Sequence, residues 1–108
     1  MLYLTNAFSI NMIRQYKDVN LNFRSVSLEE AQYLMFKDYR CVIGHADTAR
    51  LVGNLLDQTL VPERVSIQLN LGPLGDDEVL VAQYTGPRLP EGATELPEGA
   101  MIEFYLVS

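Results

Sequence analysis

The sequence predicts an α/β fold: a mixed sheet of five or six strands flanked by helices in a single domain. Strand-like and helix-like segments alternate in the first half of the chain, and strand-like segments follow one another in the second half. The length of 108 residues suits one compact domain with one modest core. We therefore expect residues 1–108 to fold as a single unit.

Three segments of the first half have the pattern of strands. Residues 1–5 are mostly apolar, and residues 19–26 alternate between apolar and polar side chains, which is typical of a half-buried strand. Residues 40–44 form a short β-branched run that predicts a buried strand. Between the first two, the spacing of apolar side chains at residues 10–13 indicates a helical turn.

Two helices are predicted from their capping residues. Ser27 and Glu30 have the spacing of a capping box, so a helix should begin there and end near Asp38. Asp47 or Thr48 should cap a second helix. The inner face of the second helix should carry Leu51, Leu55 and Leu56.

The second half predicts three more strands. Residues 64–69 alternate, residues 71–77 contain turn-forming glycines and a proline, and strands are expected over 79–84 and 101–107.

The segment between the last two predicted strands, residues 85–100, is a candidate lid. It holds three of the five prolines, and Leu-Pro-Glu-Gly occurs in it twice, at 89–92 and 96–99. Long loops in compact domains often have a function, which favours a lid over a site. A plain surface loop with two similar turns explains the pattern equally well.

Composition limits the classes of partner. A net charge of −6 argues against binding long nucleic acids, which requires a broad basic surface, but not against a small anionic ligand. The lone Cys41 cannot form an internal disulfide. No apolar stretch approaches the ~20 residues of a membrane span, and the start of the chain lacks a signal sequence's basic region. We expect a cytoplasmic protein without membrane contact.

The chain shows no pattern for a metal or an organic cofactor. Paired histidines, paired cysteines and carboxylates at ligand spacing are all missing from the sequence. Glycine-rich loops for nucleotide phosphates or dinucleotides are also missing. We therefore expect neither kind of cofactor.

His45, the single histidine, is the first candidate for chemistry. It follows a predicted strand and precedes a predicted helix, where free N–H groups and the helix dipole attract phosphate. A histidine there can also transfer protons near neutral pH. A role as a polar capping residue is the competing interpretation.

Two further segments are weaker candidates. In the candidate lid, Arg88 can grip phosphate oxygens, and Glu91 can transfer a proton or orient a partner; a surface ion pair is the alternative. The amides and hydroxyl of residues 6–11 suit a base or a ribose, although a helix cap at Ser9 explains them as well.

Together these segments resemble the viral anti-CRISPR ring nucleases, which disable type III CRISPR defence, and their CRISPR-associated relatives. The matching pieces occur in the same order along essentially the whole chain: residues 4–12, residues 43–48, Arg64-Val65, Gln83 and residues 88–92. Each piece is unspecific alone, whereas Asn-Ala-Phe-Ser combined with Gly-His before an apolar helix is fairly specific. The resemblance leaves open whether the source is a virus or a cellular CRISPR locus.

The resemblance implies a homodimer that binds cyclic tetra-adenylate across its two-fold axis and cuts it, without a metal, to short linear adenylates. The family's catalytic residues fall on His45, Arg88 and Glu91. Its ligand-contacting positions fall on Asn6, Ser9, Asn11, Thr48, Arg64 and Gln83.

One departure and two alternatives accompany this resemblance. Some viral members have a longer helical segment before the last strand, so Glu98, in the second Leu-Pro-Glu-Gly, is an alternative to Glu91. A non-catalytic module that sequesters the nucleotide would not need His45. A protein-interaction module would use these motifs only structurally.

Overall fold

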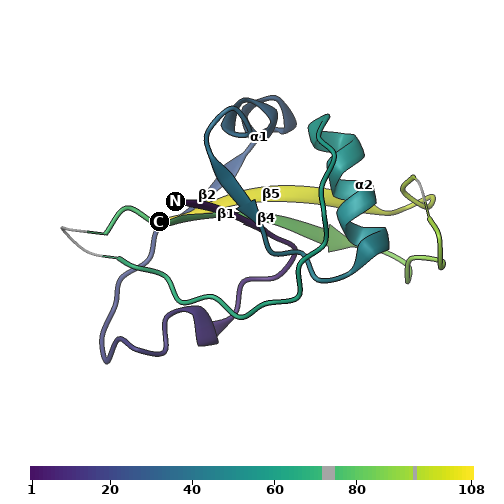
Figure 1. Ribbon diagram of the computed structural model, residues 1–108. Helices are drawn as coiled ribbons and strands as arrows, with labels where there is room; N and C mark the ends of the chain where they lie inside the picture. The colour runs from purple at the N-terminus through teal and green to yellow at the C-terminus, as the bar shows by residue number, and fades with distance from the viewer. Residues whose placement is uncertain (72–74, 94) are drawn as a thin grey trace.

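Five strands form one mixed sheet in the computed structural model, which describes residues 1–71, 75–93 and 95–108 (Figure 1). The strands are β1 (Leu2–Thr5), β2 (Phe23–Val26), β3 (Tyr39–Cys41), β4 (Glu78–Thr85) and β5 (Met101–Val107). Their order across the sheet is β2-β5-β4-β1-β3. Strand β1 runs parallel to β3 and β4, whereas β5 runs antiparallel to β2 and β4. The predicted α/β fold with a mixed sheet is confirmed.

The two faces of the sheet are covered differently. Helices α1 (Leu28–Leu34) and α2 (Ala46–Leu56) lie on one face, and the short 3-10 helix η1 (Ile10–Met12) lies on the other with extended chain (Figure 1). The helix-covered core includes Leu4, Ile43, Val52, Leu56, Leu80 and Phe104. The opposite core includes Met12, Ile13, Ile67, Leu69, Val79 and Val81. No helix in the described part of the chain has the length and apolarity needed to cross a membrane.

Helix α1 begins as predicted but ends early. The Ser27 side chain accepts a hydrogen bond from the Glu30 N–H at 3.1 Å. The Glu30 carboxylate pairs with Arg24 at 2.6 Å, so it does not close the box back onto the cap. The predicted end at Asp38 is wrong, because the helix stops at Leu34 and the next residues form tighter i→i+3 bonds, such as Lys37 N–H to the Leu34 carbonyl at 3.1 Å.

The strand predicted over residues 64–69 is wrong. This segment is extended, and its apolar side chains at 67 and 69 are buried, as the alternation requires. Its hydrogen bonds do not form a ladder, however: the Leu69 N–H donates to the Met12 carbonyl at 2.8 Å, and the Gln15 amide donates to the Leu69 carbonyl at 2.6 Å. Alternation of apolar and polar residues indicates a half-buried extended segment, whether or not the segment pairs with a strand. The turn predicted over residues 71–77 lies partly outside the described residues.

Two other predicted strands are shorter than expected. Within residues 19–26 only β2 is a strand, although Asn22 and Ser108 still exchange backbone hydrogen bonds at 2.7 and 3.0 Å beyond its end. Within residues 40–44 the strand ends at Cys41, after which the chain turns toward α2. In α2, Leu51 and Leu56 are buried as expected, and Leu55 is half-buried.

Candidate functional site

Several of the predicted site residues follow the carboxyl ends of the three parallel strands. Asn6 comes directly after β1, the Gly44-His45 pair follows β3, and Arg88 follows β4. Because β1, β3 and β4 are parallel, these ends lie at one edge of the sheet. In open α/β sheets, that edge is where ligands bind.

His45 is the N-cap of α2. Its backbone is extended (φ −107°, ψ 127°), and its Nδ1 atom accepts a hydrogen bond from the Asp47 N–H at 3.3 Å. The prediction that Asp47 or Thr48 caps this helix is therefore wrong, because the helix begins one residue before Asp47. An accepting Nδ1 carries no proton, so the proton of the neutral ring is on Nε2. The side chain of His45 is exposed.

An open cleft joins this helix terminus to the β4–β5 loop, residues 86–100. Its volume is about 1170 Å³. Figure 1 shows the loop beyond the first turn of α2, where β4 ends. Four of the predicted site residues meet in this cleft. The lining residues are His45, Ala46, Asp47, Thr48, Tyr84, Gly86, Arg88, Leu89, Pro90 and Glu91.

The β4–β5 loop contains two turns of the same kind. The Ala93 N–H donates to the Pro90 carbonyl at 3.1 Å, and the Ala100 N–H donates to the Pro97 carbonyl at 3.0 Å. The third residue of each turn is a glycine with positive φ, 78° at Gly92 and 82° at Gly99, as a type II turn requires. The two Leu-Pro-Glu-Gly repeats thus form two similar turns. Within the described residues, Glu91 lines the cleft and Glu98 does not.

The start of the loop is fixed at two points. Gly86 has φ 144°, and a Cβ atom there would lie 2.7 Å from the Cα of Ala100, so only glycine fits. The Tyr84 hydroxyl donates to the Pro87 carbonyl. Sequence analysis missed Tyr84, although β4 alternation offered a signal: Leu80 and Ala82 face the helices, so Tyr84 does too.

Asp47 connects the loop to α2. One of its carboxylate oxygens, Oδ2, accepts a hydrogen bond from the Gly92 N–H at 2.8 Å, and the side chain is 16% exposed. Sequence analysis considered Asp47 only as a cap. The contact joins residues far apart in the chain, and no local sequence pattern predicts it.

Arg64 lies beside the residue that precedes His45. A Cβ atom on Gly44 would be 3.3 Å from the Arg64 Cβ, so the two chain segments are in close contact. The segment is held to β3 by hydrogen bonds of 3.2 and 2.5 Å from Arg40 to the Glu63 carboxylate, and to the chain after β3 by the Glu63 N–H, which donates to the Ile43 carbonyl at 2.9 Å. These side-chain hydrogen bonds lower the pKa of Glu63. Arg64 does not line the cleft of this single chain.

The other four predicted ligand-contacting residues also lie outside the cleft lining. Ser9 caps η1 by accepting a hydrogen bond from the Asn11 N–H at 3.2 Å, as the alternative interpretation expected. Gln83 is on the opposite face of β4, with Val79 and Val81. Its side-chain amide donates to the Tyr84 carbonyl at 3.1 Å. Asn6 is half-buried in the turn after β1.

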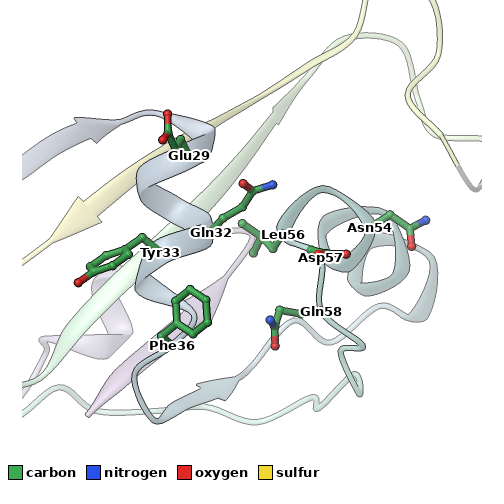
Figure 2. A pocket seen from close by; sticks show the side chains of 8 residues that line it. All are labelled: Glu29, Gln32, Tyr33, Phe36, Asn54, Leu56, Asp57 and Gln58. Carbon is green, nitrogen blue, oxygen red and sulfur yellow. The ribbon is translucent and has the colours of Figure 1, made fainter.

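A second groove lies between α1 and the end of α2 (Figure 2). Tyr33 and Phe36 stand on one side with their rings edge to face, 6.1 Å apart, and Asp57 and Gln58 lie on the other. Of the described residues, the groove's lining includes no histidine, lysine or arginine, so it has no charged donor for a phosphate. The candidate site is therefore the cleft at His45.

Other reactive groups are few in the described part of the chain. No three His, Cys, Asp or Glu side chains are grouped there as a metal site requires. Burial raises the pKa of the Cys41 thiol, which favours the unreactive protonated form.

Comparisons with known proteins give one family. The family model described as STIV B116-like matches residues 2–106. Among solved structures, the chain is similar to B116 of Sulfolobus turreted icosahedral virus, with 30% sequence identity and a TM-score of 0.78, covering 98% of this chain and 97% of that one. No curated protein matches.

Proposed function

The chain belongs to the STIV B116-like family, and we propose that it is a metal-independent ring nuclease. Its substrate would be cyclic tetra-adenylate, the second messenger of type III CRISPR defence. Degrading the ring to short linear adenylates would switch the signal off. The structural relative is a viral protein, and a viral protein that removes this messenger would protect its virus.

One observation carries the proposal: the cleft brings together the three kinds of group that cutting a phosphodiester requires. His45 can transfer a proton, Arg88 can bind the charged phosphoryl oxygens, and Glu91 can transfer a proton or orient a partner. The first turn of α2, with Thr48 in the same lining, adds the positive end of the helix dipole.

The mechanism follows from the substrate. The ribose 2′-hydroxyl oxygen attacks the adjacent phosphorus in line, and the bond from phosphorus to the 5′-oxygen breaks. A base takes the proton of the 2′-hydroxyl, and an acid supplies one to the leaving oxygen. The products are a 2′,3′-cyclic phosphate and a 5′-hydroxyl.

We assign His45 as the acid, because it is the single histidine of the chain and the imidazole is the side chain that most often transfers protons near neutral pH. Arg88 stabilises the charge on the phosphoryl group. Glu91 assists proton transfer or orients Arg88. The imidazolium that gives up a proton carries hydrogens on both nitrogens, so it would release the Asp47 N–H.

A homodimer would complete this site. A ring of four equivalent nucleotides matches a two-fold axis, because each subunit presents the same residues to opposite halves. Five predicted ligand-contacting residues lie outside the cleft of one chain and would contact the ring in the assembled dimer: Asn6, Ser9, Asn11, Arg64 and Gln83. Light scattering should give a dimer, and titration should give one ring per dimer; one ring per monomer would contradict this.

Sequestration without cutting is the second candidate, and one observation favours it. His45 already has a structural role as the cap of α2. A module that only binds the messenger needs the helix terminus and Arg88 but no proton transfer.

Incubation of the protein with cyclic tetra-adenylate, with and without excess chelator, separates these candidates. A ring nuclease should yield linear adenylates with 2′,3′-cyclic phosphate ends, detected by mass spectrometry, at a rate that the chelator leaves nearly unchanged. Binding of the intact ring without products would establish sequestration. Loss of cutting on chelation, restored by a divalent ion, would overturn the metal-independent mechanism. No binding would leave a protein-interaction module.

A further inference from the structure

Asp47 contacts both walls of the cleft. Its backbone N–H donates to Nδ1 of His45, and its carboxylate accepts from the Gly92 N–H of the β4–β5 loop. The carboxylate contact is short, at 2.8 Å, and the side chain is mostly buried. Hydrogen bonds to a charged acceptor are among the stronger ones in proteins.

We propose that Asp47 is a positioning residue that latches the loop to the first turn of α2, and so holds Arg88 and Glu91 opposite His45. The consequence for cutting rests on the proposed function. The latch itself is a property of the fold and can be measured without a nucleotide.

Because of where Gly92 lies, its one hydrogen bond to Asp47 is sufficient to position the turn that carries Glu91. Gly92 directly follows Glu91 in a closed turn, because the Ala93 N–H already binds the Pro90 carbonyl. Fixing the Gly92 N–H therefore fixes the turn as a unit, with Glu91 in it. The other end of this segment is held by the close approach of Gly86 to Ala100 and by the hydrogen bond from the Tyr84 hydroxyl to the Pro87 carbonyl. Arg88 lies between these two fixed points.

A competing explanation is that Asp47 only stabilises α2. A carboxylate in the first turn of a helix interacts favourably with the helix dipole. Asp47 also lies 3.7 Å from the Arg50 guanidinium, which is half exposed, and such surface pairs contribute little. Both of these effects need the charge of Asp47, whereas the latch needs an oxygen at the right place.

Three substitutions separate charge from placement. Asp47→Asn keeps an acceptor oxygen in place and removes the charge. Asp47→Glu keeps the charge in the first turn and moves the oxygens by one methylene. Asp47→Ala removes both. If Asp47 is a latch, Asp47→Asn should largely keep the wild-type protection of the Gly92 N–H and the cutting rate, and Asp47→Glu and Asp47→Ala should lose both. If Asp47 acts only through the helix dipole, Asp47→Glu should resemble the wild type more closely than Asp47→Asn does.

Amide hydrogen exchange at Gly92 is the direct readout. In the Glu and Ala variants the Gly92 N–H should exchange about tenfold or more faster than in the wild type, while the Asn variant stays within about threefold. The Gly99 N–H, in the matching turn, serves as the internal reference and should not respond. Circular dichroism and thermal unfolding check that all variants are folded.

Single-turnover cutting of cyclic tetra-adenylate is the second readout. The rate constant should fall about tenfold in the Glu and Ala variants and stay close to the wild-type value in the Asn variant. The affinity for the ring should change less than the rate constant does. Gly92 exchange that is rapid in the wild type, or that follows charge instead of placement, would overturn the latch. Exchange that follows placement in a protein that never cuts the ring would establish the latch and overturn the proposed nuclease.

Discussion

The two Leu-Pro-Glu-Gly turns of the β4–β5 loop are identical in sequence and similar in backbone, yet they have different neighbours. In both, the residue after glycine donates to the proline carbonyl, and glycine has positive φ. The first turn, however, lies against α2, and its glutamate lines the cleft at His45. The second leads directly into β5.

This difference teaches that the role of the motif comes from what lies opposite it. Gly92 finds the Asp47 carboxylate because α2 begins next to the end of β4. The second turn has the same residues and therefore serves as a natural control for the first. Each prediction below changes one element of this pair or of the wall that faces it.

The largest effect is expected at His45, the proposed acid on the wall that faces the first turn. His45→Asn keeps a good helix cap and removes the imidazole. Single-turnover cutting should fall by about 10²–10⁴-fold while ring affinity persists.

His45→Ala is the matched control, because it loses the cap as well. It should cut as poorly as the Asn variant and also be less stable by about 0.5 kcal/mol or more. If His45→Asn cuts at nearly the wild-type rate, His45 is a cap and the catalytic role lies elsewhere. If affinity is lost together with rate, His45 chiefly binds the ring.

The glutamates of the two turns should differ next most strongly. Glu91→Gln should lower the cutting rate by about 10²-fold, since it removes a carboxylate from the cleft. Glu98→Gln should leave the rate within about twofold. Parallel rate measurements at saturating ring decide the matter: equal effects would show that the two turns are equivalent, and a larger effect at Glu98 would reverse their assignment.

The glycines of the two turns should be equally costly for stability but unequal for cutting. A Cβ atom at Gly92 or Gly99 meets no atom within 4 Å, so alanine brings only the strain of positive φ, about 1–2 kcal/mol at either site. A small backbone shift that relieves this strain would displace Glu91 at the first turn but no cleft residue at the second, so Gly92→Ala should slow cutting severalfold and Gly99→Ala should not. Urea unfolding and cutting rates should be measured for both variants. Two variants that differ in stability but cut at the same rate would contradict this prediction.

The smallest effect is expected outside the cleft lining, where Arg40 and Glu63 hold the segment that carries Arg64. The pKa of Glu63 is lowered in the folded protein, so this pair contributes stability above the ordinary carboxyl pKa of about 4.5 and loses it as pH falls through the lowered value. Glu63→Gln should therefore be slightly less stable than the wild type at about pH 7, and the difference should shrink as pH falls below about 4.5 and through the lowered pKa. A stability difference that grows toward acid would contradict the assignment.

The sequence was a good guide where the signal was local. Strands were expected over residues 79–84 and 101–107, where β4 and β5 lie, the Ser27 cap marked the start of α1, and the position of His45 between a strand and a helix was correct. Alternation failed over residues 64–69, because it cannot distinguish a strand from an extended segment held by a 3-10 helix.

The pairing of His45 with Arg88 and Glu91 in one cleft followed from the family resemblance and not from spacing. The Asp47–Gly92 contact escaped both routes, since a hydrogen bond from a backbone N–H leaves no trace in residue type. Tyr84 escaped too, although the period of two along β4 contained the information.

The central place of β1 has a consequence for how the protein folds. Its two parallel neighbours, β3 and β4, come from much later in the chain, and the two halves of the cleft follow those neighbours. Pairings between distant segments require the closure of long loops, which slows folding. A chain that has paired β1 with β3 alone possesses α2 and His45 but no opposing wall. The cleft can therefore form only once β4 joins β1, so the rate at which the proposed cutting activity returns on refolding should report that pairing.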